Sequence, residues 1–81
     1  MARVVDTPEE RQTLAKLGNA IRARRNHLHM SQEALADAAK ISRTHMGEVE
    51  RGKRNVSFTA VVRIAKAVDM PPSELITAAG L

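Results

Sequence analysis

The sequence contains no cysteine, tryptophan or tyrosine, and Phe58 is its only aromatic residue. Without cysteine the chain can form neither a disulfide nor a thiolate metal site, and this absence fits the reducing environment of the cytosol. With one aromatic side chain, the hydrophobic core must be built from aliphatic residues, many of them alanines. Closely packed small helices suit that composition.

Long hydrophobic runs are absent as well. The lack of any stretch of about 18 apolar residues argues against a transmembrane helix, and the N-terminal sequence "MARVVDTPEER" lacks the apolar segment of a secretory signal peptide. We therefore expect a soluble, cytoplasmic protein with no membrane partner.

The residue groupings of common catalytic sites are also missing. His27 and His29 are two positions apart and would not share a helix face, no histidine is paired with an evident Ser or Cys nucleophile, and no Gly-rich loop could cradle a phosphate. No effector pocket is evident. We expect no enzymatic activity, no cofactor, no metal site and no small-molecule effector.

The chain does carry an excess of positive charge on a short length. Its 81 residues suffice for one domain but not for two independent cores. Thirteen Lys and Arg residues oppose nine Asp and Glu residues, giving a net charge of +4. Such an excess favours polyanionic partners, but many soluble proteins share it, so the positions of the charges must decide.

The first helix start signal lies near the N-terminus. Thr7, Pro8 and Glu10 form a capping-box arrangement, which predicts a helix that begins at this point. The apolar stripe that follows, with Arg25 on the same line, predicts about five turns and consists of Leu14, Leu17, Ile21 and Leu28.

Further caps predict three more helices. Ser31, with Glu33 in the first turn, precedes the second helix, Ser42 precedes the third, and Ser57 precedes the fourth. Gly52 is well placed to end the third helix, which we expect at about residues 43–51.

The fourth helix, "FTAVVRIAKAVD", has apolar residues dense enough for burial on more than one side, Phe58 included. The stretch "MPPSELITAAGL" starts a short fifth helix. No strand-like alternation or internal repeat is visible. We therefore predict an all-α fold, a compact five-helix domain over residues 8–79 that follows an N-terminal tail at residues 1–7.

Residues of about 32–51, "QEALADAAKISRTHMGEVER", carry a helix-turn-helix pattern. Ala36 is small enough for two helices to cross closely, and the apolar residues that would fasten the second helix to the first are Leu35, Ala39, Ile41, Met46 and Val49. One face of the second helix then remains outside the core. It presents Arg43, Thr44 and His45.

Residues of about 14–78 resemble the phage Cro and repressor type of helix-turn-helix, the XRE family. The matching stretches are "IRARR" ahead of "SQEALA", then "ISRTHMGEVERGKRNVS", then "AKAVDMPPSEL". Within that family, "SRT" leading into "ERGKRN" is most similar to the controller proteins of restriction-modification systems. The resemblance implies a lambda-repressor-like fold and a short, dimeric transcription regulator that binds double-stranded DNA.

Two positions depart from the family pattern. Members often have glycine where this chain has His29 and Lys40. If the backbone keeps a positive φ there, each non-glycine side chain would cost roughly 1 kcal/mol or more.

The resemblance implies that the third helix enters the major groove with its N-terminal residues nearest the bases. Arg43 can donate two hydrogen bonds to guanine, Thr44 can contact a thymine methyl or a phosphate, and His45 a base or a phosphate. Ser42 begins this edge, and Gln32 stands where the family contacts phosphate. Each of these residues could instead be an ordinary solvated or cap-region residue.

A basic segment follows the third helix. Arg51, Lys53, Arg54 and Asn55 would meet the DNA backbone or a groove edge, and such contacts dominate the salt dependence of binding. Arg54 is also a candidate for reading a base.

Glu50 is better suited to a structural role. Arg25 lies on the inward stripe of the first helix and needs a carboxylate if it is partly buried, and the family arrangement makes Glu50 a plausible partner. An unchanged thermal stability of Glu50→Gln between about pH 4 and pH 8 would argue against this pair.

The remaining apolar residues exceed what one small core obviously needs. Similar family members form dimers through their last two helices, so the expected dimer interface comprises Val61, Ile64, Val68, Met70, Leu75 and Ile76. The alternative is that all six belong to the core of one chain. A two-fold dimer would place its recognition helices about 34 Å apart, on a palindromic operator.

One other function stays open, that of an antitoxin-type module that binds a toxin and regulates its own operon. Such a module usually needs an additional toxin-binding segment, and only short tails lie outside the predicted domain. The operator sequence and the choice between activation and repression are not encoded in any pattern we identify.

Overall fold

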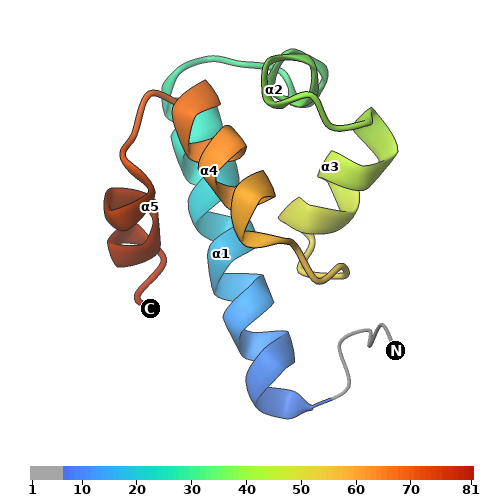
Figure 1. Ribbon diagram of the computed structural model, residues 1–81, viewed down its shortest axis with the longest axis vertical. Helices are drawn as coiled ribbons and strands as arrows, with labels where there is room; N and C mark the ends of the chain where they lie inside the picture. Colours follow the sequence, from blue (N-terminus) through green and yellow to red (C-terminus); the bar gives the residue numbers. More distant parts are fainter. Residues whose placement is uncertain (1–6) are drawn as a thin grey trace.

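The computed structural model describes residues 7–81, which form five α-helices (Figure 1). Of the predicted tail at residues 1–7, only Thr7 lies within the described residues. The helices confirm the predicted all-α, five-helix fold, and they are α1 (Pro8–His27), α2 (Gln32–Ala39), α3 (Arg43–Glu50), α4 (Phe58–Ala67) and α5 (Pro72–Ala78).

Side-chain oxygens cap the first four helices. Thr7, Ser31, Ser42 and Ser57 each accept a hydrogen bond from the backbone N–H three positions later, over 2.9–3.1 Å. These contacts satisfy N–H groups that have no partner within their own helix. The four predicted start signals are therefore confirmed.

Three helices end in a left-handed residue that is not glycine. His29, Lys40 and Asp69 have φ of 56°, 59° and 60°, where a side chain costs about 1 kcal/mol relative to glycine. In each case the next residue is apolar, and its N–H bonds back to a carbonyl of the preceding helix over 2.9–3.0 Å. The backbone thus keeps the conformation that glycine would favour, and Asp69 is a third such position, which we did not predict.

Gly52 ends α3, as predicted. It has a φ of 70°, and its N–H donates to the Val49 carbonyl over 3.0 Å while that of Lys53 donates to the Glu48 carbonyl over 2.9 Å. This paired arrangement turns the chain sharply away from the helix axis.

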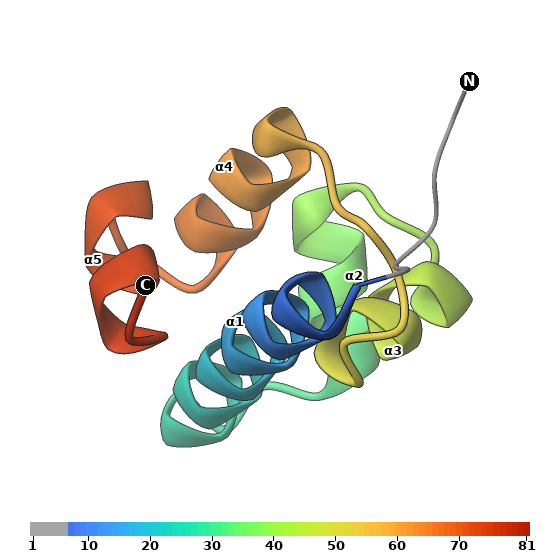
Figure 2. The same ribbon diagram turned by 90° about the horizontal axis from the view of Figure 1, so that it is seen from below.

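The core is aliphatic, as the composition requires. Its largest fully buried side chains are Ile21, Leu35, Met46, Ile64, Val68 and Leu75. Helix α2 packs on α3 and α4, whereas α1 packs on α3 and α5 (Figures 1 and 2). Phe58 is the exception to the predicted burial on α4, because its side chain is 76% exposed.

Helices α1 and α3 approach each other closely at Gly18. A Cβ atom at this position would lie 2.5 Å from the Glu50 carbonyl oxygen and 2.6 Å from that of Val49. Only glycine fits without moving the backbone, so Gly18 sets how closely α3 packs against α1.

Four of the six residues expected at a dimer interface lie in the core of the single chain. Ile64, Val68 and Leu75 are 0% exposed and Val61 is 7% exposed within the single chain. Side chains already enclosed by their own core have almost no surface left for a partner. Only Met70 and Ile76, which are partly buried, remain from that set. No helix in the described range 7–81 is both long enough and apolar enough to cross a bilayer.

Candidate nucleic-acid interface

Helices α2 and α3 form the predicted helix-turn-helix. The Ile41 N–H donates to the Ala36 carbonyl over 2.9 Å, and Ser42 then caps α3. The side chains of Met46 and Val49 are buried, which fastens α3 to the core. Arg43 and Thr44, at the N-terminus of α3, are exposed, and α3 lies at the edge of the molecule (right side of Figure 1).

A shallow hollow of about 300 Å³ gathers four predicted DNA contacts. Gln32 from the start of α2 and Arg43, Thr44 and Arg51 from α3 and its C-terminal cap line this hollow together with Gly47. A Cβ at Gly47 would lie 3.3 Å from Arg51 Nη1 and 3.5 Å from Gln32 Oε1. The missing side chain therefore keeps the space between these groups open, a role that the sequence did not predict.

Arg25 and Glu50 are brought together beneath this surface. Arg25 Nε donates to Glu50 Oε2 over 2.7 Å and Nη2 donates to Oε1 over 2.9 Å. Arg25 Nη1 also donates to the Met30 carbonyl over 3.0 Å. The Glu50 and Arg25 side chains are only 2% and 13% exposed. The hydrogen bond to Glu50 outweighs burial and raises the pKa of Arg25, so the guanidinium stays charged.

Gln32 joins this buried pair. Its Nε2 donates to Glu50 Oε1 over 3.1 Å, so the carboxylate accepts three hydrogen bonds from two side chains. The network links α1, α2 and α3 and fixes the side chain of a predicted phosphate contact. The sequence contained no signal for the Gln32 contact, because it depends on how α2 crosses α3.

A second ion pair lies at the surface. Arg54 Nε donates to Glu48 Oε1 over 2.8 Å, and the two side chains are 50% and 32% exposed. The Arg54 hydrogen bond, followed by the charge of Arg54, lowers the pKa of Glu48, and His45 and Arg51 add to this effect. Glu48 is therefore ionised at neutral pH.

Ser42 and His45 lie outside the lining of the α2–α3 hollow. The Ser42 hydroxyl accepts the His45 N–H over 3.1 Å, which is a helix-cap role. The His45 side chain is partly buried, and its Nε2 has no hydrogen-bond partner among the residues that the structure describes.

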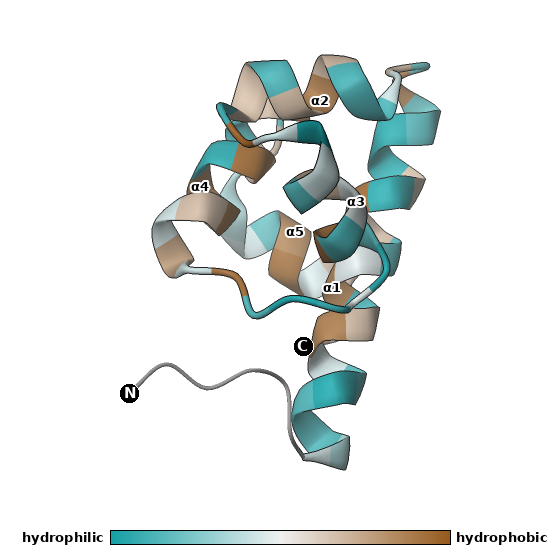
Figure 3. Cartoon of the chain, turned by 90° about the vertical axis from the view of Figure 1, so that its right-hand side faces the viewer, coloured by the Kyte–Doolittle hydropathy of each residue, from teal (hydrophilic) through white to brown (hydrophobic). Residues whose placement is uncertain are grey.

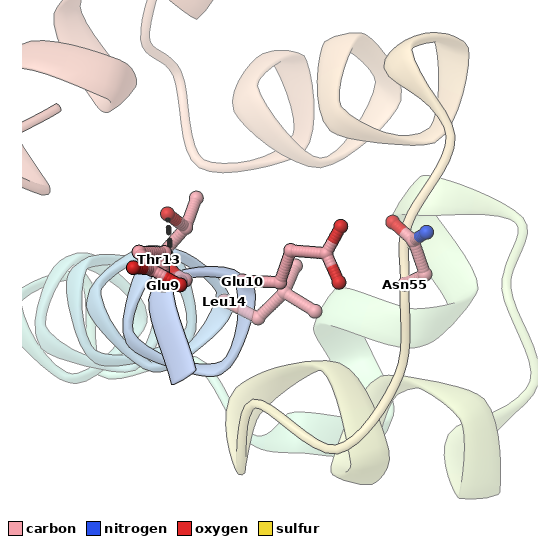
Figure 4. A pocket seen from close by; sticks show the side chains of 5 residues that line it. All are labelled: Glu9, Glu10, Thr13, Leu14 and Asn55. Carbon is pink, nitrogen blue, oxygen red and sulfur yellow. Dashed lines mark hydrogen bonds between the residues drawn. The ribbon is translucent and has the colours of Figure 1, made fainter. Parts of the chain in front are cut away.

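Asn55 lies apart from the other predicted contacts. It lines a separate hollow of about 200 Å³ with Glu9, Glu10, Thr13 and Leu14, near the start of α1 (Figure 4). The Glu10 carboxylate points toward the Asn55 loop in this view. Lys53 is exposed in the turn between these two regions.

Hydrophilic residues predominate along α3 and the first part of the loop after it (Figure 3). The basic residues of this loop are exposed: Arg51, Lys53 and Arg54. Exposed cations gathered in one segment can bind a polyanion.

Comparison with known proteins places this geometry in a family. A family model described as helix-turn-helix matches residues 21–75. The control protein C.SmaI of Serratia marcescens is 38% identical over 65 residues, which cover 80% of this chain and 77% of that protein. The control protein C.BamHI of Bacillus amyloliquefaciens is 42% identical over 48 residues, or 59% of each chain.

A solved structure agrees with these matches. The crystal structure of the restriction-modification controller protein C.AhdI from Aeromonas hydrophila has a TM-score of 0.75 and 42% sequence identity. The similarity covers 76% of this chain and 94% of that one. The resemblance identified in the sequence is thereby confirmed.

Proposed function

The chain belongs to the helix-turn-helix family and is a DNA-binding regulator, and from this premise we propose that it controls the genes of a restriction-modification system. This proposal is supported by the similarity to proteins named as controllers. For C.SmaI and C.AhdI, the matched region spans more than three quarters of the relative's own length. These relatives favour the controller over the antitoxin alternative.

We propose that the α2–α3 hollow faces the DNA. Arg43 projects from the N-terminus of α3, where its guanidinium can donate two hydrogen bonds to O6 and N7 of a guanine. Thr44 would contact a thymine methyl or a phosphate beside it. Gln32, held by Glu50, and Arg51 line the same hollow and would bind the phosphates that flank those bases.

The remaining contacts would come from the loop after α3. Lys53 is exposed and has no ion-pair partner among residues 7–81, so it is suited to a phosphate contact that carries little sequence information. We assign Ser42 chiefly to capping α3, and we expect His45 and Asn55 to contribute less than Arg43.

We further propose a homodimer on a palindromic operator. A two-fold dimer would present two copies of α3 about 34 Å apart, which matches successive major grooves. Large apolar residues from Phe58 onward that remain at least partly accessible for such an interface include Phe58, Val62, Met70, Ile76 and Leu81. Sedimentation of the free protein tests this point, and a monomer that binds one half-site with full affinity would refute it.

The proposal is tested by mapping bound sites across the genome and then footprinting them at low and moderate salt. We expect a few palindromic sites near a methyltransferase and an endonuclease gene. Arg43→Ala should lose about 5- to 150-fold in affinity for the operator and relax the preference at one base pair. Lys53→Ala should weaken binding to all sequences and reduce the salt slope by about one.

Lys66→Ala provides a matched control, because it removes an exposed positive charge from α4 without touching the α2–α3 hollow. It should change neither the preference nor the slope. Equal losses for Arg43→Ala on matched and mismatched sites would contradict the assignment of Arg43, and copurification with a tightly bound small toxin would favour the antitoxin function instead.

A further inference from the structure

Glu48 places a negative charge on the surface proposed to meet DNA. It lies on α3, four positions after Thr44 and three before Arg51, so the three side chains share one side of the helix. A carboxylate at such a place repels phosphates unless it has another role. Glu48 carries this charge at neutral pH, and the hydrogen bond from Arg54 lowers its pKa further.

Glu48 holds the loop after α3 at two points. The Lys53 N–H donates to the Glu48 carbonyl over 2.9 Å, and Arg54 Nε donates to the Glu48 carboxylate over 2.8 Å. The left-handed Gly52 turns the chain so that both contacts can form. One residue therefore fixes both the backbone of the loop and the guanidinium of Arg54 relative to α3.

The contact leaves the outer end of the Arg54 guanidinium available. Glu48 occupies Nε, whereas Nη1 and Nη2 make no hydrogen bond to any residue in the described range. Two parallel N–H donors match O6 and N7 of a guanine. Arg51 and Lys53 differ, because neither side chain is held by a hydrogen bond or ion pair within that range.

We propose that Glu48 is a positioning residue for base recognition, which holds Arg54 with its Nη1 and Nη2 groups directed at one guanine in each half-site. This inference rests on the proposed function, since it requires sequence-specific DNA binding. A long, flexible arginine loses conformational freedom when it is ordered on a base. Glu48 orders it beforehand, so Arg54 becomes a reader of sequence instead of a mobile cation that follows phosphates.

The experiment compares four variants with the wild type: Glu48→Ala, Glu48→Gln, Arg54→Ala and the double variant Glu48→Ala/Arg54→Ala. Each is titrated with the mapped operator and with operators changed at one base pair at a time. Affinity for random DNA and the salt slope are measured in parallel. Asp37→Ala is the matched control, because it removes an exposed carboxylate from α2 that has no ion-pair partner in the described chain.

Arg54→Ala should lose about 5- to 150-fold of discrimination at one base pair of each half-site. Glu48→Ala should lose discrimination at the same base pair while its affinity for random DNA stays equal or rises. Adding Glu48→Ala to Arg54→Ala should cause no further loss of discrimination. Glu48→Gln removes the same charge but keeps an oxygen that accepts from Arg54 Nε, so it should retain more discrimination than Glu48→Ala.

Two results would overturn the inference. If Glu48→Ala and Glu48→Gln strengthen binding to all sequences equally and keep full discrimination, Glu48 is only a repelling charge. If Glu48→Ala affects a base pair that Arg54→Ala does not, the two residues act separately. In both cases the proposed function still holds if the wild type binds its operator more tightly than random DNA. A wild type without any sequence preference would refute the proposed function itself.

Discussion

Replacing Glu50 by alanine should destabilise the protein severely, because it leaves Arg25 as a charged group without its partner. Arg25 is only 13% exposed and would lose both hydrogen bonds to the carboxylate, and Gln32 would lose one. Breaking a buried pair by removing one partner costs about 3–5 kcal/mol. The remaining exposure of Arg25 lets water reach part of the guanidinium, so we expect about 3 kcal/mol.

That loss is large for a chain of this size. An 81-residue domain has a free energy of unfolding of about 4–12 kcal/mol, at roughly 0.05–0.15 kcal/mol per residue. A loss of about 3 kcal/mol should lower the midpoint of thermal unfolding by about 12–24 °C. Urea unfolding followed by far-ultraviolet circular dichroism measures the change directly.

The double variant Arg25→Met/Glu50→Leu tests whether the unpaired charge, and not the loss of the ion pair itself, destabilises the fold. It removes both charges and keeps apolar volume between α1 and α3, so its stability should return to within about 1 kcal/mol of the wild type. Two results would contradict the expected role of the pair: a cost of less than about 1 kcal/mol for Glu50→Ala, or a cost for the double variant equal to the sum of those of Arg25→Met and Glu50→Leu measured singly.

Three further predictions concern the fold and its charges. Gly18→Ala should lower the free energy of unfolding by about 1–3 kcal/mol, because its Cβ would lie 2.5 Å from the Glu50 carbonyl oxygen. The control Gln12→Ala, on the exposed side of α1, should change it by less than about 0.5 kcal/mol. Equal effects of the two variants would show that α1 and α3 can separate freely. Lys40→Gly should raise the free energy of unfolding by about 0.5–1 kcal/mol, since its φ of 59° suits glycine. The control Lys66→Gly, inside α4, should lower it by about 1 kcal/mol. If urea unfolding shows that Lys40→Gly lowers the free energy of unfolding, the turn gains nothing from glycine. The Glu48–Arg54 pair should stabilise the fold at neutral pH. Because the pKa of Glu48 is lowered, this contribution should be complete above the usual carboxyl pKa, decline as the pH falls below that value, and be gone once the pH is below the lowered pKa. The difference in thermal midpoint between the wild type and Glu48→Gln, measured from neutral pH downward, checks this sign, and a difference that grows with acidity would contradict it.

The sequence was most informative where structure depends on neighbouring residues. The caps at Thr7, Ser31, Ser42 and Ser57 involve contacts three residues apart, so their residue types alone predict where helices begin. The three left-handed helix ends share a readable pattern as well. Each has an apolar residue next and then the first residue before a new helix, as in "HMS", "KIS" and "DMP". That pattern would have identified Asp69.

The sequence was least informative about which apolar residues meet which. The density of aliphatic residues in the last two helices does not distinguish a core from an interface. The fold buries Val61, Ile64, Val68 and Leu75 within one chain, because α4 packs on α2 and α5, and α5 packs on α1. Phe58 shows the opposite error, since its place in an apolar helix predicted burial and it is exposed.

The contacts of the candidate interface could be predicted only in part. A partly buried arginine needs a carboxylate partner, and the family resemblance indicated that Glu50 is this partner. The addition of Gln32 to the pair, the hollow beside Gly47 and the hold of Glu48 on Arg54 depend on helix crossing and loop path. None of these features follows from residue spacing alone.

We propose that α3 reads DNA sequence through the residues at its N-terminus. This proposal is tested most directly by the ratio of affinities for the mapped operator and for random DNA of equal length, measured for the wild type and for Arg43→Ala at one moderate salt concentration. We expect a ratio of at least about 10³ for the wild type and a ratio lower by about 5- to 150-fold for Arg43→Ala. A wild-type ratio near one, or a ratio that Arg43→Ala leaves unchanged, would contradict it.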